Sequence, residues 1–190
     1  MTPAEYELVT CGSRPRASGT APRTVPCGQI TAHKGGIRAA VFDRHGRVLA
    51  TGSDDGIVNL WQVGSWDLLK TLDFSGDLSI CLSLAFSPGQ DVLGYGGDRS
   101  SALIDIANGK IRHLLDARNS ILQVVFDPAG VTVATAGGDS QVRLWDASDG
   151  RLLATLAGHS SNHMVTTVAF APQWPSTRHR HPGLPAPAAP

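Results

Sequence analysis

The sequence predicts an all-β protein built from repeated units of short antiparallel strands. Residues 131–146 show the pattern most clearly, because two apolar, β-branched runs flank the turn sequence G-G-D-S-Q at residues 137–141. This arrangement is typical of a β-hairpin. The same pattern occurs at residues 48–62 and, more weakly, at residues 92–106. Three such hairpins in one order indicate a repeat.

Turn-forming residues divide each unit into four strand candidates. In chain order they are residues 37–42, 48–53, 57–62 and 68–72, then 81–86, 92–95, 101–106 and 111–115, then 121–126, 131–136, 142–147 and 152–156. A fourth unit begins with the strand candidate at residues 165–172 and is followed by the proline-rich residues 173–190. Since proline cannot donate to a β-ladder, this tail is predicted to be disordered.

The spacing of the units matches the blade of a β-propeller. The phenylalanine that ends the first strand recurs at intervals of 44, 40 and 44 residues, as Phe42, Phe86, Phe126 and Phe170. Four strands in about 40–45 residues is the repeat length of a propeller, in which sheets stack around a common axis. We therefore expect a partial β-propeller of four-stranded antiparallel blades. The predicted blades are residues 32–72, 73–115 and 116–156, with an incomplete blade at 157–172.

Residues 1–31 are predicted to form a separate, partly disordered N-terminal segment. Within it, residues 6–11 and 25–31 are candidate edge strands. Three blades make an open arc, and two arrangements would complete it. Either the N-terminal strands pair beside residues 165–171, or two chains self-associate into a larger ring.

Composition argues against several classes of function. The chain has 190 residues and a formal net charge of +0, so it presents no basic field for nucleic acid. No apolar run approaches the roughly 18 residues that a membrane helix needs, and the N-terminus lacks a secretory leader. Cys11, Cys27 and Cys81 show no C-x-x-C spacing, so we expect reduced thiols, no metal site and a cytoplasmic location. We expect no cofactor.

The first and third units resemble the WD-repeat β-propeller family. In that family a His before the first strand, a Ser or Thr in the second, an Asp in the following turn and a Trp in the third strand form a buried hydrogen-bond relay. The first unit matches every position, whereas the third has Ala117 at the His position. The fourth begins with Gly158-His159. The resemblance thus implies a structural relay of His33, Thr51, Asp55, Trp61, Asp98, Thr135, Asp139, Trp145 and His159.

The second unit is the most divergent copy. Only Asp98 matches the relay, because Asp77 stands at the His position, Gly94 at the hydroxyl position and Ile104 at the Trp position. We nevertheless expect Asp55, Asp98 and Asp139 to occupy equivalent corners of stacked sheets. Trp145-Asp146 is the signature dipeptide, while Trp66-Asp67 precedes a fourth strand and does not count as one.

We interpret the relay as structural and not catalytic. A buried carboxylate is tolerated only when donors surround it, and His, Thr and backbone amides supply them. The sequence has no G-x-S-x-G nucleophile elbow. Its glycine-rich turns connect strands, so they lack the helix N-terminus that binds phosphate.

The resemblance implies a non-catalytic protein–protein interaction scaffold. Its partner-binding rim would comprise the loops before each first strand and the corners between second and third strands. The residues predicted there are Lys34, Asp54, Asp77, Gly97, Arg118, Asn119 and Gly138. Two alternatives stay open, namely a regulatory propeller fragment of a larger bacterial signalling kinase or NTPase, and a truncated product without function. We expect protein partners or self-association, and neither nucleic acid nor membrane.

Overall fold

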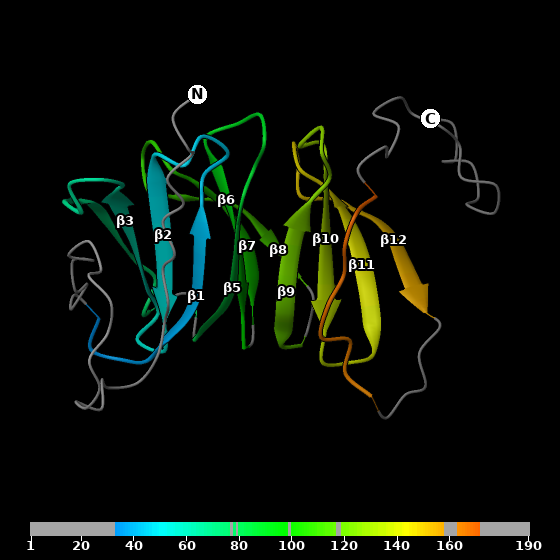
Figure 1. The fold of residues 1–190 in the computed structure, drawn as a ribbon. Helices are drawn as coiled ribbons and strands as arrows, with labels where there is room; N and C mark the ends of the chain where they lie inside the picture. The colour runs from blue at the N-terminus through cyan, green and yellow to red at the C-terminus, as the bar shows by residue number, and fades with distance from the viewer. Residues whose placement is uncertain are drawn as a thin grey trace, which may run out of the picture.

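The fold consists of β-sheets alone in the residues that the computed structural model describes, which are 33–76, 78, 80–98, 100–116, 119–157 and 163–171. Within these residues, twelve strands form three antiparallel sheets of four strands each, and there is no helix (Figure 1). The described residues accordingly contain no helix long and apolar enough to cross a membrane. The predicted all-β fold of four-stranded blades is confirmed.

Each sheet is one blade, and its strands lie side by side in chain order. Blade one contains β1 (Ile37–Phe42), β2 (Val48–Ser53), β3 (Ile57–Gln62) and β4 (Leu68–Asp73). Blade two contains β5 (Cys81–Phe86), β6 (Val92–Gly97), β7 (Ser101–Asp105) and β8 (Ile111–Leu115). Blade three contains β9 (Ile121–Phe126), β10 (Thr132–Gly137), β11 (Gln141–Asp146) and β12 (Leu152–Ala157).

Turn chemistry explains where the first two strands of blades one and three meet. Oδ1 of Asp43 accepts the amides of Arg47 and Val48 at 2.6 and 2.9 Å. Oδ1 of Asp127 accepts the amides four and five residues further on, at 2.8 and 2.9 Å. A side chain that satisfies backbone donors in this way fixes a tight turn, which is why aspartate favours such positions.

The segment predicted as the first strand of a fourth blade does not form a strand. Residues 163–171 run in extended form beside blade three (Figure 1), and Val165, Val168 and Phe170 pack on its apolar face. A strand is defined by a hydrogen-bonded neighbour, and no described residue pairs with this segment as a strand. The predicted N-terminal edge strands at residues 6–11 and 25–31 and the predicted disorder of residues 173–190 lie outside the described residues.

The core lies between the blades. One cluster joins blades one and two through Leu60, Leu72, Leu84 and Ile104, and a second joins blades two and three. In chain order, β1 packs on β5 and β5 packs on β9. Because successive side chains point to opposite faces of a strand, each blade can bury one face against each neighbour.

Hydrogen bonds across the outer strands reinforce this stacking. Nζ of Lys70 on β4 donates to the carbonyl oxygens of Ile106 and Ala107 in blade two, at 2.9 and 2.6 Å. His113 on β8 takes the same ladder position and its Nε2 lies 2.9 Å from the carbonyl oxygen of Ser148 in blade three. Each outer strand is thus tied to the turn that precedes the next outer strand.

Glycine occupies that turn because both conformation and space require it. Gly109 and Gly150 have φ of +74° and +72°, a region that side chains with a Cβ rarely adopt. A Cβ at Gly109 would lie 3.0 Å from Leu72 Cδ2, and one at Gly150 would lie 2.6 Å from His113 Cβ. The turn therefore sits directly against the preceding blade.

Substituting Gly150 tests this close approach. Gly150→Ala and the control Gly64→Ala both place a Cβ at positive φ (+72° and +96°), but only Gly64 has open space around it. Both changes carry the conformational cost of about 1–2 kcal/mol, and only Gly150→Ala adds an overpacking cost of about 1–3 kcal/mol. Urea unfolding of the two variants measures the difference, and equal destabilisation would contradict the tight contact.

Candidate functional site

Blade one holds the complete set of relay side chains in mutual contact. Nε1 of Trp61 donates to Oγ1 of Thr51 at 2.9 Å, and the same oxygen lies 2.8 Å from Nε2 of His33. Because indole is only a donor, the Thr51 hydroxyl accepts from Trp61 and keeps its own proton and a second lone pair for His33. Nδ1 of the same imidazole is buried and lies 3.5 Å from Oδ1 of Asp55.

Backbone amides hold the carboxylate of Asp55. Oδ2 accepts the amides of Lys34 and Gly35 at 3.0 and 3.4 Å, and Oδ1 accepts the amide of Ile57 at 3.1 Å. Burial by itself would raise the pKa of Asp55, but the hydrogen bonds from Ile57, Lys34, Ser53 and Gly35 outweigh it, so the pKa is lowered. The charged carboxylate fastens the segment before β1 to the corner between β2 and β3.

Blade three keeps half of this arrangement and replaces the rest. Nε1 of Trp145 donates to Oγ1 of Thr135 at 2.9 Å, as in blade one. Asp139 instead binds Nη2 of Arg143 at 2.6 Å, and Arg143 occupies the strand position that Asn59 has in blade one. Burial works to raise the pKa of Asp139, and the guanidinium of Arg143 overrides it and lowers the pKa.

Blade two places tyrosine where the other blades have threonine. Leu93 pairs with Ile104, so the hydroxyl position two residues further along β6 is Tyr95 and not Gly94, which corrects the prediction. Tyr95 is fully buried, and its ring meets Phe74 edge-on with centroids 6.1 Å apart. Burial raises the pKa of the Tyr95 phenol, which therefore stays protonated. A large aromatic ring thus fills the space of the Thr–Trp pair.

The corner that carries Asp98 is one residue shorter than the other two. Gly96 pairs with Ser101, whereas the corresponding pairs in blades one and three lie six positions apart. Oδ1 of Asp98 lies 2.8 Å from Oγ of Ser120, the residue that precedes β9 in blade three. The three acids lie at the corner of their blades, and each has different partners.

The predicted rim is only partly assembled in the described residues. Lys34 is exposed and Asn119 lies beside Gly138, whose ideal Cβ would be 3.4 Å from Oδ1 of Asn119. Asp54 binds Arg38 through two hydrogen bonds of 2.7 and 3.1 Å. Gly97 is buried at the end of β6 and cannot reach a partner, so the rim must be corrected to exclude it. Three predicted site residues lie outside the described residues, namely Asp77, Arg118 and His159.

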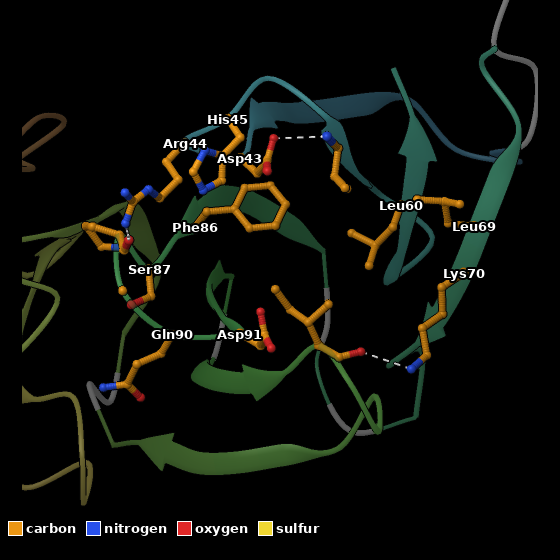
Figure 2. A pocket seen from close by; sticks show the side chains of 14 residues that line it. Asp43, Arg44, His45, Leu60, Leu69, Lys70, Phe86, Ser87, Gln90 and Asp91 are labelled. Carbon is orange, nitrogen blue, oxygen red and sulfur yellow. Dashed lines mark hydrogen bonds between the residues drawn. The ribbon is translucent and has the colours of Figure 1, made fainter. Parts of the chain in front are cut away.

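A pocket of about 610 Å³ opens between blades one and two, at the opposite end of the strands from the rim. Figure 2 shows Leu60 and Phe86 among its apolar walls, with Asp43, Arg44 and Lys70 around them. Nη1 of Arg44 donates to the carbonyl oxygen of Pro88 at 2.6 Å. Since Lys70 and Asp43 also bind backbone groups, these charges join the two blades and the turns around the pocket.

No arrangement for group transfer or metal binding emerges from these contacts. Burial raises the pKa of Cys81, the free cysteine of β5, to about 12, so it is not a nucleophile at neutral pH. In the part of the chain that the structure describes, no three His, Cys, Asp or Glu side chains gather where they could hold a metal ion. The Asp, His and Thr of blade one serve each other and the backbone.

Two features of the site were missed by the sequence reasoning. The relay pattern does not include Arg143 as a partner of Asp139. An arginine four residues after an aspartate in a tight hairpin is nevertheless a signal for this pairing. The sequence pattern gives Trp66 no role, yet Trp66 has φ of +61° and stands where the other blades have Gly109 and Gly150. Aligning the three turns by residue type would have revealed this exchange.

Comparison with known proteins agrees with the geometry. Residues 24–62 and 109–146 match the family model described as WD domain, G-beta repeat. The chain is similar to autophagy-related protein 16 of Arabidopsis thaliana, with 26% identity covering 75% of this chain and 36% of the relative. It is similar to protein hir1 of Schizosaccharomyces pombe, with 26% identity covering 83% and 19%. It is also similar to eukaryotic translation initiation factor 3 subunit I of Phaeosphaeria nodorum, with 30% identity covering 67% and 42%.

Stacked four-stranded sheets, two of which carry a Thr–Trp hydrogen bond between their second and third strands, define a repeat protein of the propeller class. Together with the matching family model, this arrangement shows that residues 24–62 and 109–146 carry WD repeats. The chain spans well under half of the length of these relatives, 36% of the first and 19% of the second.

The relay predicts a large loss of stability for Trp61→Ala and a small one for Asp146→Ala. Trp61→Ala removes a buried ring and its bond to Thr51, so it should lower the free energy of unfolding by about 3–5 kcal/mol. Asp146→Ala removes a half-buried acid whose partners, Ser148, Asp149 and Arg151, lie in or next to its own turn, so its cost should stay near 1 kcal/mol. Chemical denaturation measures both, and a loss below about 1 kcal/mol for Trp61→Ala would contradict its packing role.

The lowered pKa of Asp55 predicts a specific acid dependence. A carboxyl with a depressed folded-state pKa contributes stability above its unfolded pKa of about 3.9, and this stability is lost as the pH falls through the lower folded value. Asp55→Asn should therefore flatten the fall of unfolding free energy below about pH 4. The control Asp67→Asn alters an exposed acid outside this network. In this variant the unfolding free energy should fall below about pH 4 as steeply as in the native chain.

Proposed function

We propose that this chain is a non-catalytic scaffold that binds other proteins. The carrying observation is that the polar side chains of blade one, which on paper resemble a catalytic set, are used within the fold. Thr51 is shared between Trp61 and His33, and Asp55 is held by backbone amides. Groups engaged in this way stabilise the turn and are not available to activate a substrate.

The proposed partner-binding rim lies at the end of the blades where β1 and β9 begin. Its described members are Lys34, Asp54, Asn119 and Gly138, and Asp77 and Arg118 belong to it by sequence. Arg38 neutralises Asp54, and the chain as a whole has a formal net charge of +0. This mixed surface suits a protein partner better than nucleic acid or a lipid surface. We assign the chain to the cytoplasm and assign it no cofactor.

The relatives support the class of function and no single process. Their names refer to autophagy in one case and translation initiation in another. Fold alone does not fix a partner, because many functions use the same architecture. The proposal is therefore a binding platform whose partner is set by the residues of the rim.

A charge change on the rim tests the proposal. The full chain is immobilised, and proteins captured by native chain, Lys34→Glu and Lys110→Glu are compared by mass spectrometry. Lys110 is exposed in the β7–β8 turn at the other end of the blades, so it is the matched control. A partner lost with Lys34→Glu and retained with Lys110→Glu supports the rim. Equal capture by all three chains contradicts it.

A further inference from the structure

In the first two blades, a large side chain on the outer strand packs against a glycine of the next blade. Lys70 of β4 lies against Gly109, where an added Cβ would be 3.6 Å from Lys70 Cε and 3.0 Å from Leu72 Cδ2. His113 of β8 lies against Gly150, where an added Cβ would be 2.6 Å from His113 Cβ. The two junctions between described blades thus pair a large residue on the outgoing face of one blade with glycine on the incoming face of the next.

The two open ends of the arc carry the reverse combination. In blade three the ladder position of Lys70 and His113 is occupied by Ala154, which pairs with Leu144 as Lys70 pairs with Leu60 and His113 with Leu103. In blade one the turn position of the two glycines is occupied by Trp66. The outgoing end therefore has the smallest side chain of its series and the incoming end has the largest.

Trp66 is a true structural counterpart of the two glycines. Its amide donates to the carbonyl oxygen of the residue four earlier at 2.8 Å, as do the amides of Gly109 and Gly150 at 2.8 and 2.9 Å. All three have φ between +61° and +74°. The Cβ of Trp66 therefore points where the outer strand of a preceding blade would lie, and an outer strand bearing Lys or His there would collide with it.

The outgoing face of blade three is also open at its outer edge. Leu156 takes the ladder position of Leu72 and Leu115, which are 3% and 1% exposed, but Leu156 is 49% exposed. Three blades are too few for a ring, because propellers have at least about four. The three described blades therefore cannot close a ring by themselves.

We propose that two copies of this chain associate head to tail, with Trp66 of each copy seated against Ala154 of the other. The contact would continue the geometry of the two internal junctions, with the large and small residues exchanged across it. This exchange gives specificity, because the Trp66 end rejects an outer strand like β4 or β8 and accepts β12. The proposal concerns the blade ends and is independent of the rim.

Residues 163–171 regulate access to this face. Val165, Val168 and Phe170 pack where the inner strand of a following blade would lie. Among described residues this segment is held by hydrogen bonds from Val165 N to Gly137 O at 3.2 Å and from Val168 N to Gln123 Oε1 at 2.6 Å, with Ser140 Oγ donating to His163 O at 2.6 Å. Docking of a second copy requires this segment to leave, so the two compete.

The test compares the association of size-changed chains by sedimentation and light scattering. Trp66→Gly removes the large partner, and Ala154→Lys restores the residue of blade one to the outgoing end of blade three. Each variant alone should weaken self-association by about tenfold or more, as expected for a central Trp anchor or a clash against it. Leu153→Lys is the matched control, because it adds the same side chain one position away, on the opposite face of β12.

Mixing the two weakened variants is the decisive arm. In a mixed pair, one junction joins the Trp66→Gly site to the Ala154→Lys site, which copies the Gly109–Lys70 junction, and the other junction is native. The mixture should therefore recover native association. If thermal unfolding shows that Ala154→Lys does not fold, Ala154→His, which copies His113, takes its place in both arms.

Three results would overturn the proposal. They are a monomer mass for the native chain at every concentration, no recovery in the mixture of folded variants, and equal weakening by Leu153→Lys. A further arm concerns residues 163–171: Val168→Ser should tighten association by loosening the competing segment, and unchanged association would contradict docking on this face.

Discussion

A four-stranded sheet with apolar residues on both faces cannot be stable alone, and the rest of this structure depends on that constraint. Leu72, Leu115 and Leu156 occupy one ladder position in three blades and are 3%, 1% and 49% exposed. Burying such a leucine contributes about 1.5–3 kcal/mol. The first two blades gain this stabilisation from the blade that follows, whereas among the described residues the extended segment 163–171 covers part of the face of blade three.

The relay fixes the second and third strands of one sheet to each other. Two blades share the bond from an indole Nε1 to a threonine Oγ1, at 2.9 Å in both. The residues around this bond differ. Blade one has His33, and blade three has Arg143 bound to Asp139. Blade two dispenses with the bond and fills the same space with Tyr95. Different side chains therefore fill the equivalent position in each blade.

The sequence allowed the strands, the repeat length and the residues of the first relay to be predicted, because those depend on local periodicity and on spacing within one unit. The position of Tyr95 was misjudged because the corner of blade two is one residue shorter, and counting along the chain does not reveal a register. The bond from Ser120 to Asp98 crosses from one blade to the next. No pattern within a single unit contains that information.

The turn before each outer strand shows how local and distant causes combine in one residue. Gly109 and Gly150 meet two requirements. The backbone of the turn needs a positive φ, and the preceding blade leaves no room for a Cβ. Trp66 makes the same turn and bears the conformational cost that a bulky residue meets there. No described blade precedes it, so the demand for space is absent. The residue type at this turn therefore reports whether a blade has a neighbour packed in the ordinary way, a property of assembly recorded at a single position of the sequence.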